Sequence, residues 1–131
     1  MDLLIDVHSG ETDTLIPNLI MALSLKAQGV DVSVFLEWRA LVAFVEKDFK
    51  YSLPVAKYAP VIEENAKKMG LPVDPMALLE AVKSAGIPIY GCAVEAALSG
   101  VREKVPPEVE LLEMADLTKP IVEAKKIIGG M

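Results

Sequence analysis

Short apolar runs alternate with segments of helical periodicity along the whole chain, and this alternation constrains the fold more than any other feature of the sequence. The apolar runs predict strands over residues 2–7, 30–36, 87–90 and 109–114. Strands that alternate with helices pair in parallel, because each crossover helix must lie on a face of the sheet. The sequence therefore predicts an α/β fold of three layers, with a mostly parallel sheet and helices on both faces.

The segment after the first strand predicts a helix that is apolar nearly all round. Pro17 suits its first turn, and Gly29 supplies a stop at its carboxyl end. Helical spacing predicts an inward stripe that consists of Ile16, Leu19, Ile20, Leu23 and Ala27. Further apolar residues lie outside this stripe, namely Met21, Ala22 and Leu25. Such a helix needs cover on more than one side, so we expect part of it to lie at a subunit interface.

Two later helices carry local start signals. Asp74 and Pro75 form an N-cap and first-turn pair, which predicts a helix that ends near Gly86. Asp116 is expected to cap a final helix, which would follow the last strand. The inward residues of that final helix are predicted to be Leu117, Ile121, Ala124 and Ile128.

The composition predicts one domain, residues 1–131, in the cytoplasm. Hydrophobic residues make up 53% of the chain and charged residues 24%, which exceeds the usual apolar share of a soluble domain. No run approaches the roughly 18 uncharged apolar residues that a membrane span needs. No basic region precedes an apolar segment at the N-terminus, as it would in a secretory signal.

Charge, cysteine content and loop sequence argue against several classes of partner. The net charge of −6 argues against nucleic acid, and a single cysteine excludes an internal disulfide and a multi-cysteine metal site. The loop at residues 8–14 joins a strand to a helix, as a phosphate loop does. However, Glu11 and Asp13 place carboxylates where a phosphate would bind, and no nucleotide-binding motif is present. We therefore expect no cofactor and no metal.

Cys92 is the only cysteine, and it lies where the apolar run 87–90 meets Gly91 and the helix-forming stretch 93–98. This order places the thiol in the first turn of a helix, at the carboxyl end of a strand. The helix dipole and the unpaired N–H groups there favour a thiolate, which is the nucleophilic form of cysteine. The alternative is that Cys92 is buried as a small apolar residue, as cysteines frequently are.

Further polar side chains are expected at the same edge of the sheet, because ligands gather at the carboxyl ends of parallel strands. His8 is the only histidine, so it is the most economical acid/base partner for Cys92. The alternative is a loop histidine that only bonds the backbone. Ser9, in the same loop, is a candidate binding residue.

The second strand is followed by Glu37, Trp38 and Arg39. Arg39 is a candidate to hold a thiolate or an anion, and the alternative is an ion pair with Glu37 or a neighbouring acid. Trp38 is expected to pack in the fold or to anchor an interface. Glu95, about one helical turn after Cys92, either caps N–H groups of the first turn or disfavours the thiolate by like-charge repulsion.

The segment from Cys92 to Val101, after an Ile-Pro-Ile-Tyr strand, resembles the active-cysteine segment of the DsrE/DsrF/TusD sulfur-relay family. The stretch 16–22, Gly29 and the 32–35 strand look like the opening of the DsrE-like branch that is labelled peroxiredoxin-like. The Pro-x-x-x-Thr-x-x-Cys arrangement of peroxiredoxins is absent, and so is a second, resolving cysteine. Residues 47–60 match no known segment of the relay proteins.

The resemblance implies a flavodoxin-like, layered α/β domain that assembles into a homo-oligomer, as a dimer, trimer or hexamer. It implies a sulfurtransferase-like carrier, in which Cys92 accepts sulfane sulfur as a persulfide and passes it to a thiol of a partner protein. Sulfur donor and acceptor proteins would then be its partners, and whether the chain is itself an enzyme stays open. The alternative is a non-catalytic oligomeric or small-ligand-binding module with a buried cysteine.

Overall fold

Five parallel strands form one sheet in the order β4-β3-β2-β1-β5. The computed structural model describes residues 1–129. The strands are β1 Leu3–Val7, β2 Val32–Leu36, β3 Ile89–Cys92, β4 Glu110–Leu112 and β5 Lys126–Ile128. The helices are α1 Thr12–Ala27, α2 Trp38–Glu46, α3 Leu53–Ala56, α4 Ala59–Met69, α5 Pro75–Ser84, α6 Ala93–Leu98 and α7 Lys119–Glu123, with a 3-10 turn η1 at Arg102–Lys104.

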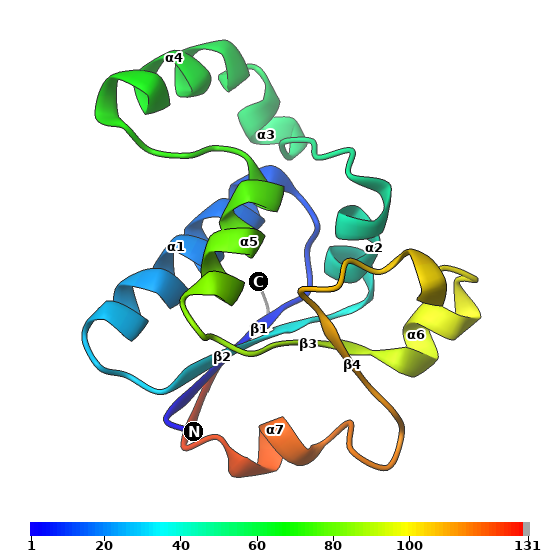
Figure 1. Cartoon of the computed structure of the whole chain (residues 1–131). Coiled ribbons are helices and arrows are strands. Elements are labelled where there is room, and N and C mark those ends of the chain that lie inside the picture. The colour runs from blue at the N-terminus through cyan, green and yellow to red at the C-terminus, as the bar shows by residue number, and fades with distance from the viewer. Residues whose placement is uncertain (130–131) are drawn as a thin grey trace.

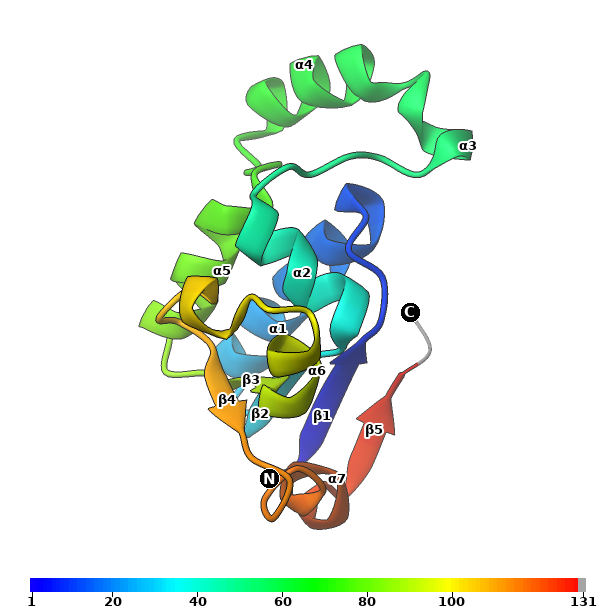
Figure 2. The same cartoon turned by 90° about the vertical axis from the view of Figure 1, so that its right-hand side faces the viewer.

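Helices lie on both faces of this sheet, which confirms the predicted fold class (Figure 1). The chain passes from β1 through β2 and β3 to β4 in one direction across the sheet, and then returns to β5 beside β1 (Figure 2). Right-handed crossovers place helices on one face while the chain advances and on the other face when it reverses. Accordingly, α1, α2 and α5 cover one face, and α7 lies against the other (Figure 1).

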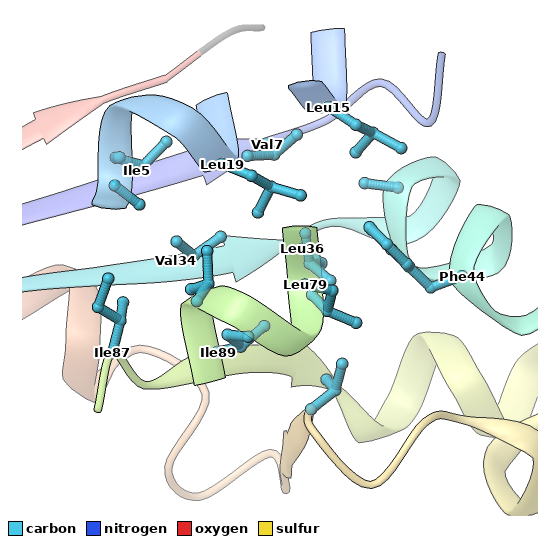
Figure 3. Close-up of a cluster of buried hydrophobic side chains, with 14 of the residues drawn as sticks. Ile5, Val7, Leu15, Leu19, Val34, Leu36, Phe44, Leu79, Ile87 and Ile89 are labelled. Carbon is cyan, nitrogen blue, oxygen red and sulfur yellow. The ribbon is translucent and has the colours of Figure 1, made fainter. Parts of the chain in front are cut away.

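The main hydrophobic core lies between the sheet and helices α1, α2 and α5 (Figure 3). The sheet contributes alternate residues, such as Ile5, Val34 and Ile89, and α2 contributes Phe44. Each of these side chains is at most 1% exposed. Burial of an aliphatic or aromatic side chain of this size stabilises the fold by roughly 1.5–3 kcal/mol relative to leaving it exposed.

Strand alternation sends a second set of side chains to the opposite face of the sheet. Successive strand residues point to opposite faces, so the neighbours of the core residues on β1, β2 and β3 point away from the main core. Leu4, Phe35 and Cys92 are buried, and none of them belongs to the main core cluster. The candidate cysteine therefore lies on the face that α7 covers.

The C-terminal segment differs from the sequence prediction. Residues 124–128 were expected to continue a final helix, but that helix ends at Glu123, and β5 pairs with β1. The amide of Lys125 donates to the carbonyl oxygen of Met1 at 3.2 Å, and that of Lys126 to Asp2 at 3.1 Å. Residues 126–128 therefore pair with the free edge of β1, although their local sequence pattern also fits a helix.

Helix α1 buries a face that differs from the predicted stripe. Leu15, Leu19 and Ala22 are fully buried, whereas Ile16 and Ile20 are only partly buried against the core. The helix is apolar on both of these faces, so the expectation of an interface along it stays a prediction. No helix within residues 1–129 has the length and apolar character that a membrane crossing requires.

Candidate functional site

Cys92 ends β3 and caps α6. Its backbone is extended, with φ −90° and ψ 117°, and its Sγ accepts a hydrogen bond from the amide of Glu95 at 3.4 Å. The sequence prediction placed the thiol in the first helical turn, and the structure places it one residue earlier, at the N-cap. The sulfur therefore accepts from an N–H group that the helix itself leaves unpaired.

The Cys92 side chain is buried, with 4% of the residue exposed. Ala93, which follows it, is 1% exposed, and Gly91 before it lies in close contact with the main core. A partner protein can reach the sulfur only if neighbouring side chains move. This burial agrees with the packing alternative, whereas the position at a helix start agrees with the reactive one.

The register of the sheet places His8, Glu37 and Cys92 in one row. Val7 is paired with Leu36, which is paired with Gly91, and the three residues follow these one position later. The amide of Glu37 donates to the carbonyl oxygen of Val7 at 2.8 Å, so the ladder continues beyond the end of β2. His8, Glu37 and Cys92 are thus brought to the same edge of the sheet, on the face away from the main core.

The His8 ring and the Asp6 carboxylate lie within hydrogen-bond distance of each other at this edge. Nε2 of His8 lies 3.1 Å from Oδ2 of Asp6, and the His8 side chain is 54% exposed. Oδ1 of Asp6 is buried and has no hydrogen-bond partner. One ligand atom each from Asp6, His8 and Glu37 lie within 4.8 Å of one another, and these are donor types that bind metal ions.

Two carboxyl groups at this edge of the sheet, those of Glu37 and Glu95, have raised pKa values. Burial, together with a hydrogen bond to Asp6 and its negative charge, raises the pKa of Glu37 to about 7. Burial also raises the pKa of Glu95, and the charge of Asp6 adds to this effect while His8 opposes it. We name Asp6, His8, Glu37, Glu95 and Cys92 the thiol corner.

Sequence reasoning missed Asp6 and Glu37 as members of the thiol corner. Asp6 was taken as part of an apolar strand, and Glu37 was placed at the carboxyl edge of the sheet with no role beyond an ion pair with Arg39. Their signal was a carboxylate at or just after the end of a predicted strand, on the same side as Cys92. That these residues lie close together can be predicted only when the strand order is known.

Arg39 and Trp38 lie in a neighbouring hollow rather than in the thiol corner. The hollow has a volume of about 340 Å³ and includes Gly10 and Glu11 in its lining. Arg39 forms an ion pair with Glu11 at 3.9 Å, not with Glu37. Trp38 donates from Nε1 to Oγ of Ser99 at 2.6 Å, which joins the start of α2 to the end of α6.

Ser9 and Gly10 shape the loop between β1 and α1. Oγ of Ser9 accepts from the amide of Glu11 at 3.2 Å, so this hydroxyl supports the start of α1. A Cβ on Gly10 would lie 2.5 Å from the carbonyl oxygen of Arg39, and only glycine allows this approach to α2. The loop therefore holds α2 against the sheet edge.

Comparisons with known proteins point to the fold. No protein-family model matches the chain, and no curated protein matches it. Among solved structures, the ychN protein from E. coli matches with a TM-score of 0.67 and 17% sequence identity, over 98% of this chain and 97% of that one. This level of identity shows the architecture alone. The chain thus has a layered α/β fold similar to that of the ychN protein.

Proposed function

We propose that the protein carries sulfane sulfur on Cys92. The Cys92 thiolate attacks the outer sulfur of a donor persulfide, forms Cys92–S–SH and releases the donor as a thiolate. A thiolate of an acceptor protein then attacks the outer sulfur of Cys92–S–SH, and Cys92 leaves as a thiolate. Each step forms one S–S bond and breaks one, so no resolving cysteine and no external oxidant are needed.

The observation that carries this proposal is the position of the Cys92 sulfur at the start of α6. The Glu95 amide donates to this sulfur at 3.4 Å, so a backbone N–H donor is in place for the sulfur before and after the transfer. The layered α/β fold and the resemblance of the segment 92–101 to the relay proteins support the same reading.

We assign to Glu37 the exchange of a proton with the Cys92 thiol. It follows β2 in the same row as Cys92, and its pKa of about 7 lets it gain and lose a proton near neutral pH. The sequence favoured His8 for this role. In the structure His8 pairs with Asp6 at 3.1 Å, and we assign it to hold the Asp6 carboxylate in place.

Sulfur transfer also requires that partner proteins dock beside Cys92. Exposed apolar side chains are present on the elements that flank the cysteine. Leu98, at the end of α6, is 70% exposed, and Met114, just beyond the strand that pairs with Cys92, is 72% exposed. Donor and acceptor proteins would bind to these side chains while the residues that cover the Cys92 sulfur move aside.

A non-catalytic oligomeric or ligand-binding module is the second candidate function. The observation that favours it is the 4% exposure of Cys92, which is typical of a cysteine that serves packing. In that case the sulfur only fills buried space at the carboxyl end of β3.

Intact mass spectrometry separates the two functions. The purified protein is incubated with several sulfane-sulfur donors and weighed, with Cys92→Ser as the matched control. A gain of one sulfur atom that Cys92→Ser abolishes supports the carrier, and the gain should disappear when an acceptor thiol is added. No gain with any donor supports the module and contradicts the carrier.

A further inference from the structure

We propose that Asp6, His8 and Glu37 bind a divalent transition-metal ion of the Zn²⁺ type at the carboxyl edge of β1 and β2. This proposal does not depend on sulfur transfer by Cys92, and in the metal-bound protein Glu37 and His8 act as ligands in place of the roles assigned to them above.

The donor atoms already lie close together. Nε2 of His8 is 3.1 Å from Oδ2 of Asp6, and the ligand atoms of Asp6, His8 and Glu37 all lie within 4.8 Å of one another. Bonds of roughly 2.0–2.2 Å to a tetrahedral or octahedral ion place neighbouring ligand atoms about 3 to 3.5 Å apart. Small side-chain rotations therefore bring the three groups onto one ion.

The backbone that carries these ligands is well ordered by the sheet. Asp6 lies within β1, and Glu37 directly follows β2, where its amide extends the ladder to Val7 at 2.8 Å. Asp6 and His8 are two residues apart in an extended segment, so their side chains point to the same face of the sheet. Asp6 is a strand residue, and His8 and Glu37 are the first residues after β1 and β2, so the sheet fixes the backbone at or directly beside each ligand.

Apart from His8, no basic side chain within residues 1–129 pairs with the carboxyl groups of Asp6 and Glu37. Asp6, Glu37 and Glu95 contribute carboxylates, whereas no lysine or arginine within residues 1–129 forms an ion pair with Asp6 or Glu37. Arg39, the basic residue that follows Glu37 most closely, binds Glu11 instead.

Two buried oxygens of the corner have no partner, namely Oδ1 of Asp6 and Oε1 of Glu95. A buried acceptor without a partner costs roughly 1–3 kcal/mol, and more when it is charged. A bound cation removes this cost for Asp6 directly and offsets the charge of Glu95. The unpaired Asp6 oxygen therefore belongs to one of the three proposed ligands, and a bound cation would satisfy it.

The donor set selects the class of ion. Imidazole nitrogen favours Zn²⁺, Fe²⁺, Ni²⁺ and Cu²⁺, whereas Mg²⁺ and Ca²⁺ prefer oxygen ligands alone. The His8 side chain is 54% exposed, so the ion can enter from solvent and retain water at its remaining coordination positions. We take Zn²⁺ as the probe and Mg²⁺ as the comparison ion.

His8 makes the test unusually direct, because it is the only histidine in the chain. The full-length protein is stripped of metal and titrated with Zn²⁺, with calorimetry for affinity and proton NMR for the His8 ring signals. We expect binding of one ion per chain, together with a shift of the His8 ring signals. His8→Ala should lower the affinity at least about 10-fold, since even second-shell changes have effects of roughly 10–100-fold. Mg²⁺ should not compete.

Three variants distinguish this proposal from its alternatives. Glu37→Gln should weaken Zn²⁺ binding as His8→Ala does, and Glu11→Gln, a carboxylate of the neighbouring hollow, should leave it unchanged. Cys92→Ser should also keep the affinity, although it abolishes any sulfur loading. His8 is exposed, so His8→Ala is expected to fold, and circular dichroism checks this.

The proposal is overturned if Zn²⁺ leaves the His8 ring signals in place or if His8→Ala binds as tightly as the native protein. Loss of binding in Cys92→Ser would assign the ion to the thiol and would overturn the ligand set proposed here. Failure of sulfur loading with intact Zn²⁺ binding would contradict only the carrier function.

Discussion

At the scale of single residues, the thiol corner is defined by acids rather than by the cysteine alone. Asp6, Glu37 and Glu95 surround a single imidazole, His8, and burial raises the pKa of both glutamates. A carboxyl with a pKa near neutrality can exchange protons with a thiol or release its proton to a metal ion. The titratable groups at this edge of the sheet therefore come from segments that are distant from one another in the chain.

Glu37 should make the stability of the protein depend on pH. The pKa of Glu37 is about 7 in the folded protein, against 4.5 in an unfolded chain. The protonated form favours folding, so this stabilisation is complete below pH 4.5 and is lost as the pH rises to about 7. The full difference corresponds to roughly 3 kcal/mol, and solvent screening of this partly exposed group reduces the expected effect to about 1 kcal/mol.

Urea unfolding of metal-free protein at several pH values measures this effect. Glu37→Gln keeps a neutral hydrogen-bonding side chain, and it should remove the part of the pH dependence that lies between 4.5 and about 7. If Glu37→Gln shows the same fall in the free energy of unfolding as the native protein, Glu37 is not the titrating group.

At the scale of secondary-structure elements, local signals predicted the helix boundaries better than the final strand. Asp74 caps α5 by accepting from the Met76 amide at 3.1 Å, as the Asp-Pro pair predicted. Gly70, with φ 68°, ends α4. Residues 47–60, which match no known segment of the relay proteins, contain the short helix α3 and the first residues of α4. The β5 strand was missed because its partner, β1, is at the other end of the chain.

The assignment of residues 126–128 to a strand predicts that two neighbouring isoleucines contribute unequally to the free energy of unfolding. Ile128 packs against the main core, whereas Ile127 is 47% exposed. We expect Ile128→Ala to lower the free energy of unfolding by about 1 to 2 kcal/mol, because it leaves a partial cavity. The matched Ile127→Ala should change it by less than about 0.5 kcal/mol. Denaturant unfolding measures both, and equal effects of the two variants would contradict the strand.

At the scale of the whole molecule, the segment from α3 to α4 stands apart from the sheet in both views (Figures 1 and 2). We name residues 53–71 the arm. The arm exposes several large apolar side chains, namely Leu53 at 92%, Met69 at 69%, Tyr58 at 52%, Val61 at 46% and Leu71 at 45%. Exposed apolar side chains that gather on one segment are typical of an interaction surface.

We predict that the protein is a homo-oligomer and that the arm contributes to its interface. Light scattering coupled to gel filtration should give a mass above that of one chain. Leu53→Ser together with Met69→Ser should shift the protein toward the monomer, because both side chains lose apolar area at the interface. Val122→Ser, which changes a 79% exposed residue on α7, serves as the control. A monomeric native protein would contradict this prediction.

The sequence by itself determined the alternation of strands and helices, the parallel sheet, the cap at Asp74 and the position of Cys92 near a helix start. These features depend on neighbours within one or two turns of chain, so local patterns report them. Only the tertiary structure decided that residues 126–128 form a strand, that Cys92 is buried, and that Asp6 and Glu37 meet His8. These outcomes depend on strand order and register, which join segments that are far apart in the sequence.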